Sequence, residues 1–123
     1  MTLMEALHRI DNLKPNTLGE GEKIKWISTL DGIVKEEIID THEGGEGVVF
    51  NGYDEATNKM TELLIKAPYD EIYLYWLQGK IDYWNGEYTK YNNSMEMYNE
   101  AYSMFERYYN RTHKPKGKKF NFF

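Results

Sequence analysis

One segment constrains the fold of this chain more than any other. Between Glu87 and Thr112, large side chains recur at alternating intervals of three and four residues, which is the spacing of a continuous stripe along one face of a helix. A helix of this length would extend about 39 Å at about 1.5 Å per residue. The stripe, called the tyrosine seam below, comprises Tyr88, Tyr91, Met95, Tyr98, Tyr102, Phe105 and Tyr109.

The apolar surface of this helix is wider than a single stripe. Met97, Ala101, Met104 and Tyr108 lie beside the tyrosine seam and widen the apolar arc to roughly 160°. Either the other helices of the chain cover the whole arc, or part of it meets another subunit. Tyrosine suits an interface because its ring is buried while its hydroxyl stays hydrated or paired. The candidate subunit-interface residues are therefore Tyr91, Tyr98, Tyr102, Phe105, Tyr108 and Tyr109.

Three further helices are predicted upstream. Thr2 and Glu5 have the spacing of a capping box, which predicts a helix over 3–13. Apolar residues that advance by three and four predict a second helix over 22–40 and a third over 69–84. The chain is therefore expected to be mainly α-helical, a small bundle of about four helices.

The segment between the second and third helices is expected to differ from the rest. Two short apolar runs, "VVF" and "ELLIK", flank the polar stretch "NGYDEATNKMT", whose Asn51-Gly52 pair is a turn signal. We predict a short β-hairpin or an extended loop here, with residues 41–68 projecting from the body. Residues 1–113 would then form a single helical domain.

Basic charge gathers at the C-terminus. Six of the 15 basic residues and none of the 20 acidic ones lie beyond Glu106, so the first 106 residues carry a charge of about −11 and the remainder about +6. Residues 114–123, "KPKGKKFNFF", form a basic arm rich in phenylalanine. Such an arm could dock into a groove of another protein, contact nucleic acid through phosphates and stacking, or be an accidental tail. The acidic body argues against extensive DNA binding because it would repel phosphates.

No group of residues has the sequence pattern of a catalytic, metal or cofactor site. His42 and Glu43 have no third ligand at a metal-binding spacing, and we expect them at an exposed helix end. The glycine-rich "EGGEG" lacks the lysine and serine of a phosphate-binding loop. There is no cysteine, and no apolar run approaches the ~20 residues that cross a bilayer. We expect a soluble protein that is not an enzyme, holds no metal or cofactor and contacts no membrane.

Several motifs resemble those of one family. "IDYWNGEY", "KYNNSM" and "YYNRTH" lie in the C-terminal half, and "TLMEALHRIDNLKPNT" and "THEGGEGVVFNGY" precede them. Together they resemble small proteins of the head-tail connector (adaptor) family of tailed bacteriophages and prophages, and the likeness covers most of the chain. This resemblance implies a structural virion protein, a mainly helical adaptor that forms a ring, typically dodecameric, beneath the portal and links the capsid to the tail.

The resemblance also implies partners and a location. The expected partners are further copies of the chain, the portal protein and the next stopper or tail protein, while DNA passes through the ring without specific binding. The protein would lie at the head-tail interface of the virion, and in the host cytoplasm during assembly. Two other functions stay open: another head-completion or tail-joining phage protein, and a small regulatory module that binds nucleic acid through its tail. The arm that would dock on the portal comprises Arg111, Lys114, Lys116, Lys118, Lys119, Phe120, Phe122 and Phe123.

Overall fold

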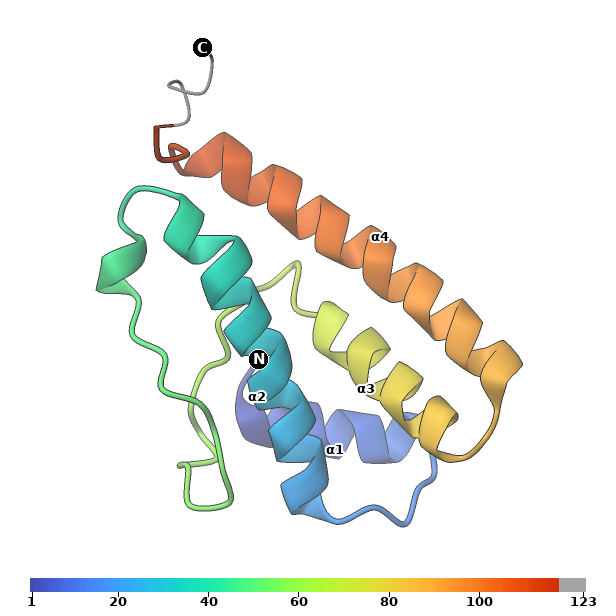
Figure 1. Cartoon of the computed structure of the whole chain (residues 1–123). Coiled ribbons are helices and arrows are strands. Elements are labelled where there is room, and N and C mark those ends of the chain that lie inside the picture. Colours follow the sequence, from blue (N-terminus) through green and yellow to red (C-terminus); the bar gives the residue numbers. More distant parts are fainter. Residues whose placement is uncertain (118–123) are drawn as a thin grey trace.

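The computed structural model of this chain describes residues 1–117 and confirms a mainly helical fold. Both α1 and α2 pack against α3, and α4 runs alongside α3 (Figure 1). Two short 3-10 turns, Ile39–Thr41 and Gly45–Gly47, follow α2. The helices are α1 (Leu3–Leu13), α2 (Glu20–Glu37), α3 (Ile72–Trp84) and α4 (Tyr88–Thr112).

The first helix has the predicted bounds and the predicted cap. The Thr2 hydroxyl accepts a hydrogen bond from the backbone N–H of Glu5 at 3.1 Å, and the Glu5 carboxylate accepts one from the N–H of Thr2 at 2.8 Å. These two bonds satisfy backbone donors that have no partner within the helix. Leu3, Leu7 and Ile10 are buried on one face, as their spacing requires.

The second helix begins two residues before the predicted start and ends three before the predicted end. After Glu37 the chain tightens into the 3-10 turn Ile39–Thr41, so the prediction of a helix to Asp40 is corrected. The Thr41 hydroxyl donates a hydrogen bond to the backbone carbonyl of Ile38 at 2.8 Å. Threonine side chains bond nearby backbone in this way at helix ends, where carbonyl groups lack partners.

The third and fourth helices form a hairpin with unequal arms. α3 begins at Ile72 rather than at residue 69, and α4 begins one residue after the predicted Glu87. Gly86 has φ +74°, a conformation that glycine adopts without strain, and this lets the chain reverse between the helices. At about 1.5 Å per residue, α4 is roughly twice as long as α3. It therefore extends past the start of α3 toward the end of α2 (Figure 1).

The loop between α2 and α3 is extended, and its second half does not project. No β-strand occurs among residues 1–117, so the hairpin alternative is not found; an isolated bridge pairs Thr2 with Glu62. Leu63 and Ile65 are fully buried in the core, which contradicts the expectation that all of 41–68 stands away from the body. The apolar run "ELLIK" thus packs against the helices instead of pairing with another strand.

A buried carboxylate fastens this loop to the helices. Asp31 of α2 accepts hydrogen bonds from the hydroxyls of Tyr53 and Tyr73 and from the backbone N–H of Leu64. The Tyr73 hydroxyl in turn accepts a bond from the N–H of Ile65 at 2.9 Å. A buried polar group is costly unless it is paired, and this network pairs both oxygens of the carboxylate.

Candidate functional site

The tyrosine seam is divided between the core and the surface. Three residues of the seam are between 3% and 9% exposed: Tyr98, Phe105 and Tyr109. The ring of Tyr98 packs against Trp76, that of Phe105 against Tyr69, and that of Tyr109 against His42. These three rings are largely covered by the same chain and belong to its core, although each also lines one of the grooves described below; their part in a subunit interface stays a prediction. The other three candidates keep part of their surface in solvent: Tyr91, Tyr102 and Tyr108.

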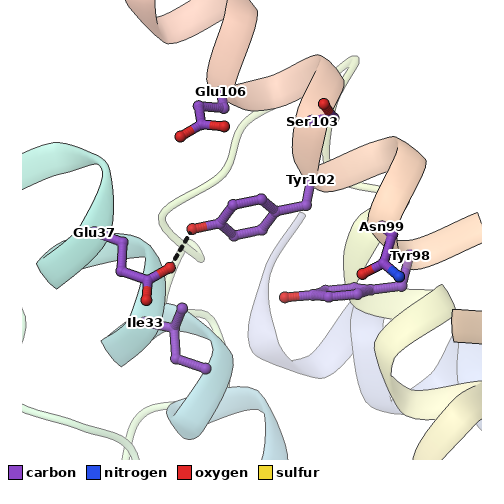
Figure 2. Close-up of a pocket in the computed structure, with 7 residues that line it drawn as sticks. All are labelled: Ile33, Glu37, Tyr98, Asn99, Tyr102, Ser103 and Glu106. Carbon is purple, nitrogen blue, oxygen red and sulfur yellow. Dashed lines mark hydrogen bonds between the residues drawn. The ribbon is translucent and has the colours of Figure 1, made fainter.

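A groove of about 310 Å³ separates α2 from α4, and we call it the α2–α4 groove. The Tyr102 hydroxyl crosses it and donates a 2.7 Å hydrogen bond to the Glu37 carboxylate (Figure 2). Tyr98 lies below with its ring along the groove, and Glu106 lies above. The lining residues are Ile33, Glu37, Tyr98, Asn99, Tyr102, Ser103 and Glu106.

The two tyrosines of this groove stay protonated. Burial raises the pKa of Tyr98 to about 12, with the negative charge of Glu37 adding to the effect. Burial also raises the pKa of Tyr102, and so does its hydrogen bond to Glu37. The groove therefore presents two aromatic rings and a donating hydroxyl beside the side chains of Glu37 and Glu106. A tyrosine that stays protonated donates a hydrogen bond rather than taking up a proton or attacking as a nucleophile.

A second hollow lies on another side of α4, around Tyr69. We call it the Tyr69 groove, and it consists of two adjoining depressions of about 190 and 200 Å³ that share the Tyr69 ring. That ring packs 4.6 Å from the ring of Tyr108. Ala101 lines the Tyr69 groove, whereas its neighbour Tyr102 lines the α2–α4 groove, because successive helix residues point about 100° apart. The depression nearer α3 is lined by Pro68, Tyr69, Glu71, Tyr75, Ala101 and Met104.

Large apolar side chains are exposed along the α3–α4 hairpin. Three aromatic residues at its turn are more than half exposed, and two methionines of α4 are nearly half exposed. Isolated exposed apolar residues are normal, whereas grouped ones form a patch, and Met104 of this group also lines the Tyr69 groove. The five residues are Tyr83, Trp84, Tyr88, Met97 and Met104.

The base of the basic arm is held against the residues that follow α2. The backbone N–H of Glu43 donates to the carbonyl of Lys114 at 2.8 Å, and the N–H of Lys116 donates to the carbonyl of Thr41 at 2.9 Å. The Lys116 ammonium lies 3.1 Å from the Glu46 carboxylate. Arg111 is exposed in the last turn of α4. The remaining arm residues, Lys118, Lys119, Phe120, Phe122 and Phe123, lie outside the described residues.

His42 is buried, which contradicts the prediction of an exposed helix end. It is 4% exposed, and its Nε2 lies 2.7 Å from the side-chain oxygen of Asn110. Its Nδ1 lies 2.6 Å from the carbonyl oxygen of Ile38, and its ring meets the edge of Tyr109. His42 therefore joins the end of α2 to the end of α4. The sequence carried no signal for this contact, because the two helices meet only through the fold.

The described part of the chain contains no cluster of side chains suited to a metal ion. None of its helices is long and apolar enough to cross a membrane. The polar side chains at the α2–α4 groove are those of Glu37, Glu106, Asn99 and Ser103 with two tyrosine hydroxyls, and Lys66, Glu71 and His113 lie at the Tyr69 groove. A scan against protein-family models and searches of curated proteins and solved structures found no match to this chain.

Proposed function

We propose that this protein is a structural head-tail connector of a tailed bacteriophage or prophage. One observation carries the proposal: the outer helix α4 is flanked by two different grooves, each lined by aromatic side chains that the chain itself covers only in part. Partly covered aromatic and methionine side chains are enriched at subunit interfaces. The motifs "IDYWNGEY", "KYNNSM" and "YYNRTH" support the assignment to the connector family.

Two different surfaces on one subunit suit a ring. When a surface of one copy meets a different surface of the next copy, the contact repeats around an axis and closes if the rotation permits. The α2–α4 groove and the exposed hairpin turn at Tyr83, Trp84 and Tyr88 are such a pair of surfaces. In this proposal, the ring lies beneath the portal, and Tyr91, Tyr102 and Tyr108 contribute to contacts between neighbours.

The charge distribution supports a DNA channel with a separate docking arm. The first 106 residues carry all 20 acidic residues, and an acidic wall lets DNA pass because it does not attract phosphates. The basic arm then reaches the portal, starting from a base that is fixed at Thr41 and Glu43. The opposite face of the ring receives the next stopper or tail protein.

Co-elution with the portal protein encoded in the same genome tests this proposal. We expect the chain to join portal rings and to elute at their mass in light scattering. A chain that ends after Gly117 keeps the described contacts of the arm base and should fold normally but fail to dock. The matched control, Lys25→Glu, changes an exposed residue of α2 and should dock as the wild type does.

Further variants and DNA separate the alternatives. Replacing Lys118 and Lys119 with glutamate tests the charge of the arm, and replacing Phe122 and Phe123 with serine tests its aromatic side chains. If the portal is ignored while duplex DNA is bound in a salt-dependent manner, the connector is discarded in favour of a nucleic-acid-binding module. If the portal is ignored and a later tail component is bound, the protein is a different tail-joining part.

A further inference from the structure

The outer face of α4 carries charges that no described residue neutralises. Glu96 and Glu100 lie in its first half and Arg107 and Arg111 in its second half, and all four are exposed. Among residues 1–117, none of these four forms an ion pair. At about 100° per residue the four side chains fall within roughly 60° of one another around the helix. They form one stripe, acidic at one end and basic at the other.

The spacing within this stripe is symmetric. Four residues separate Glu96 from Glu100, and four separate Arg107 from Arg111. If a second copy of α4 lies antiparallel on this face with its Arg107 opposite Glu100, its Arg111 necessarily lies opposite Glu96. Because the contact is two-fold, the same two pairs form again with the roles of the copies exchanged. One register therefore gives four ion pairs, which use all four glutamates and all four arginines of the two stripes.

Apolar side chains lie where this register needs them. Met97 and Met104 border the charged stripe and are 46% and 47% exposed. The midpoint between Glu100 and Arg107 falls beside Met104, so the two copies of Met104 would meet at the two-fold axis. The aliphatic stem of Arg111 from the second copy would cover Met97. Met104 also lines the Tyr69 groove, which widens the apolar surface available to the second copy.

We infer that the outer face of α4 binds a second copy of this chain in antiparallel orientation, with Glu96 and Glu100 paired to Arg111 and Arg107 of that copy. A two-fold contact uses the same surface on both partners and stops at two chains. This dimer is therefore distinct from the proposed ring and does not depend on it. The α2–α4 groove adjoins this face, because Ser103 lines the groove and accepts a hydrogen bond from Arg107 at 3.1 Å.

Charge exchange tests the inference with the full chain. Light scattering and sedimentation should find the wild type as a dimer of two chains. Either Arg107→Glu or Glu100→Arg should raise the dimer Kd about tenfold or more, because two attractive pairs become repulsive. The double variant with both substitutions should restore the wild-type Kd. Lys25→Glu is the matched control, since it changes the net charge as Arg107→Glu does and should leave the Kd unchanged.

A cross-link tests the position of the axis. The chain has no cysteine, so Met104→Cys introduces a single one. Oxidation should convert this variant to a disulfide-linked dimer, whereas Lys25→Cys should stay uncrosslinked. Circular dichroism confirms that each variant is folded. A wild-type chain that is monomeric at the highest attainable concentration overturns the inference, as does a dimer whose Kd the double variant fails to restore.

Discussion

α3 and α4 pack against each other, yet they use the same side chain differently. Tyr73 of α3 is fully buried and donates its hydroxyl to the carboxylate of Asp31. Tyr102 of α4 is partly exposed and donates its hydroxyl to the carboxylate of Glu37. The bonds are chemically alike, but α3 is surrounded by three helices whereas α4 lies at the outside of the bundle. The number of neighbours, more than the residue type, decides whether a tyrosine is buried in the core or stays partly exposed.

The largest expected effect comes from truncating an apolar side chain of α3. Leu77 is fully buried, so Leu77→Ala should lower the free energy of unfolding by about 2 to 5 kcal/mol through lost burial and a residual cavity. Chemical denaturation monitored by circular dichroism measures the loss. The control is Met97→Ala on α4, which should cost much less because its side chain is nearly half exposed. Equal losses would contradict the contrast between the two helices.

Removing the hydroxyl of Tyr73 should have the next largest effect. Tyr73→Phe takes one hydrogen bond from Asp31 and leaves the N–H of Ile65 without its acceptor. Unpaired buried polar groups cost about 1 to 3 kcal/mol, so the free energy of unfolding should fall by that amount. Amide hydrogen exchange should also show reduced protection at Ile65. Unchanged protection there would mean that the loop does not depend on this bond.

The pH dependence of stability tests the Asp31 network. Burial raises the pKa of Asp31, although the hydrogen bonds from Tyr53, Tyr73 and Leu64 oppose the shift. The folded chain then holds this proton more tightly than the unfolded chain does. The contribution of Asp31 protonation to the free energy of unfolding is complete below the unfolded pKa of about 3.9. This contribution is lost as the pH rises through the higher folded pKa. Denaturation curves of the wild type should show this loss, and curves of Asp31→Asn should not.

The opposite slope would reverse the interpretation of Asp31. If the wild type gains stability over Asp31→Asn as the pH rises through this range, the three hydrogen bonds outweigh the cost of burial, and the folded pKa lies below the unfolded one.

The smallest expected effect is at the groove tyrosine. Tyr102→Phe removes the bond to Glu37, which lies beside solvent, so the free energy of unfolding should fall by less than about 1 kcal/mol. Comparing this variant with Tyr73→Phe isolates the effect of burial, since the chemical change is identical. A loss as large as that of Tyr73→Phe would place Tyr102 in the core and remove it from the proposed interface.

Local sequence signals predicted the helices well. The capping box of Thr2 and Glu5 located α1, and the alternating spacing of the tyrosine seam located α4 to within one residue. These signals succeed because they depend on contacts three or four residues apart. The end of α2 was missed because the chain changes to a 3-10 turn there. The Thr41 hydroxyl bonds the carbonyls at the end of α2, and the Thr41 carbonyl accepts a tertiary hydrogen bond from the N–H of Lys116.

Contacts between distant segments were not predictable in the same way. The run "ELLIK" has the composition of a strand, but its Leu63 and Ile65 are buried by the helices. His42 was predicted to be exposed, yet it joins Ile38 to Asn110. Asp31 gave no sign that Tyr53 and Tyr73 would converge on it. Each contact brings together residues that the chain separates, and periodicity contains no information about such distances.

The sequence by itself determined a mainly helical chain, the length of its last helix and the contrast between an acidic body and a basic tail. Only the tertiary structure decided how much of each tyrosine of the seam is buried and which groove it lines. The physical reason is geometric: spacing assigns a side chain to a face of a helix, but the packing of α2, α3 and the loop determines how much of that face is covered.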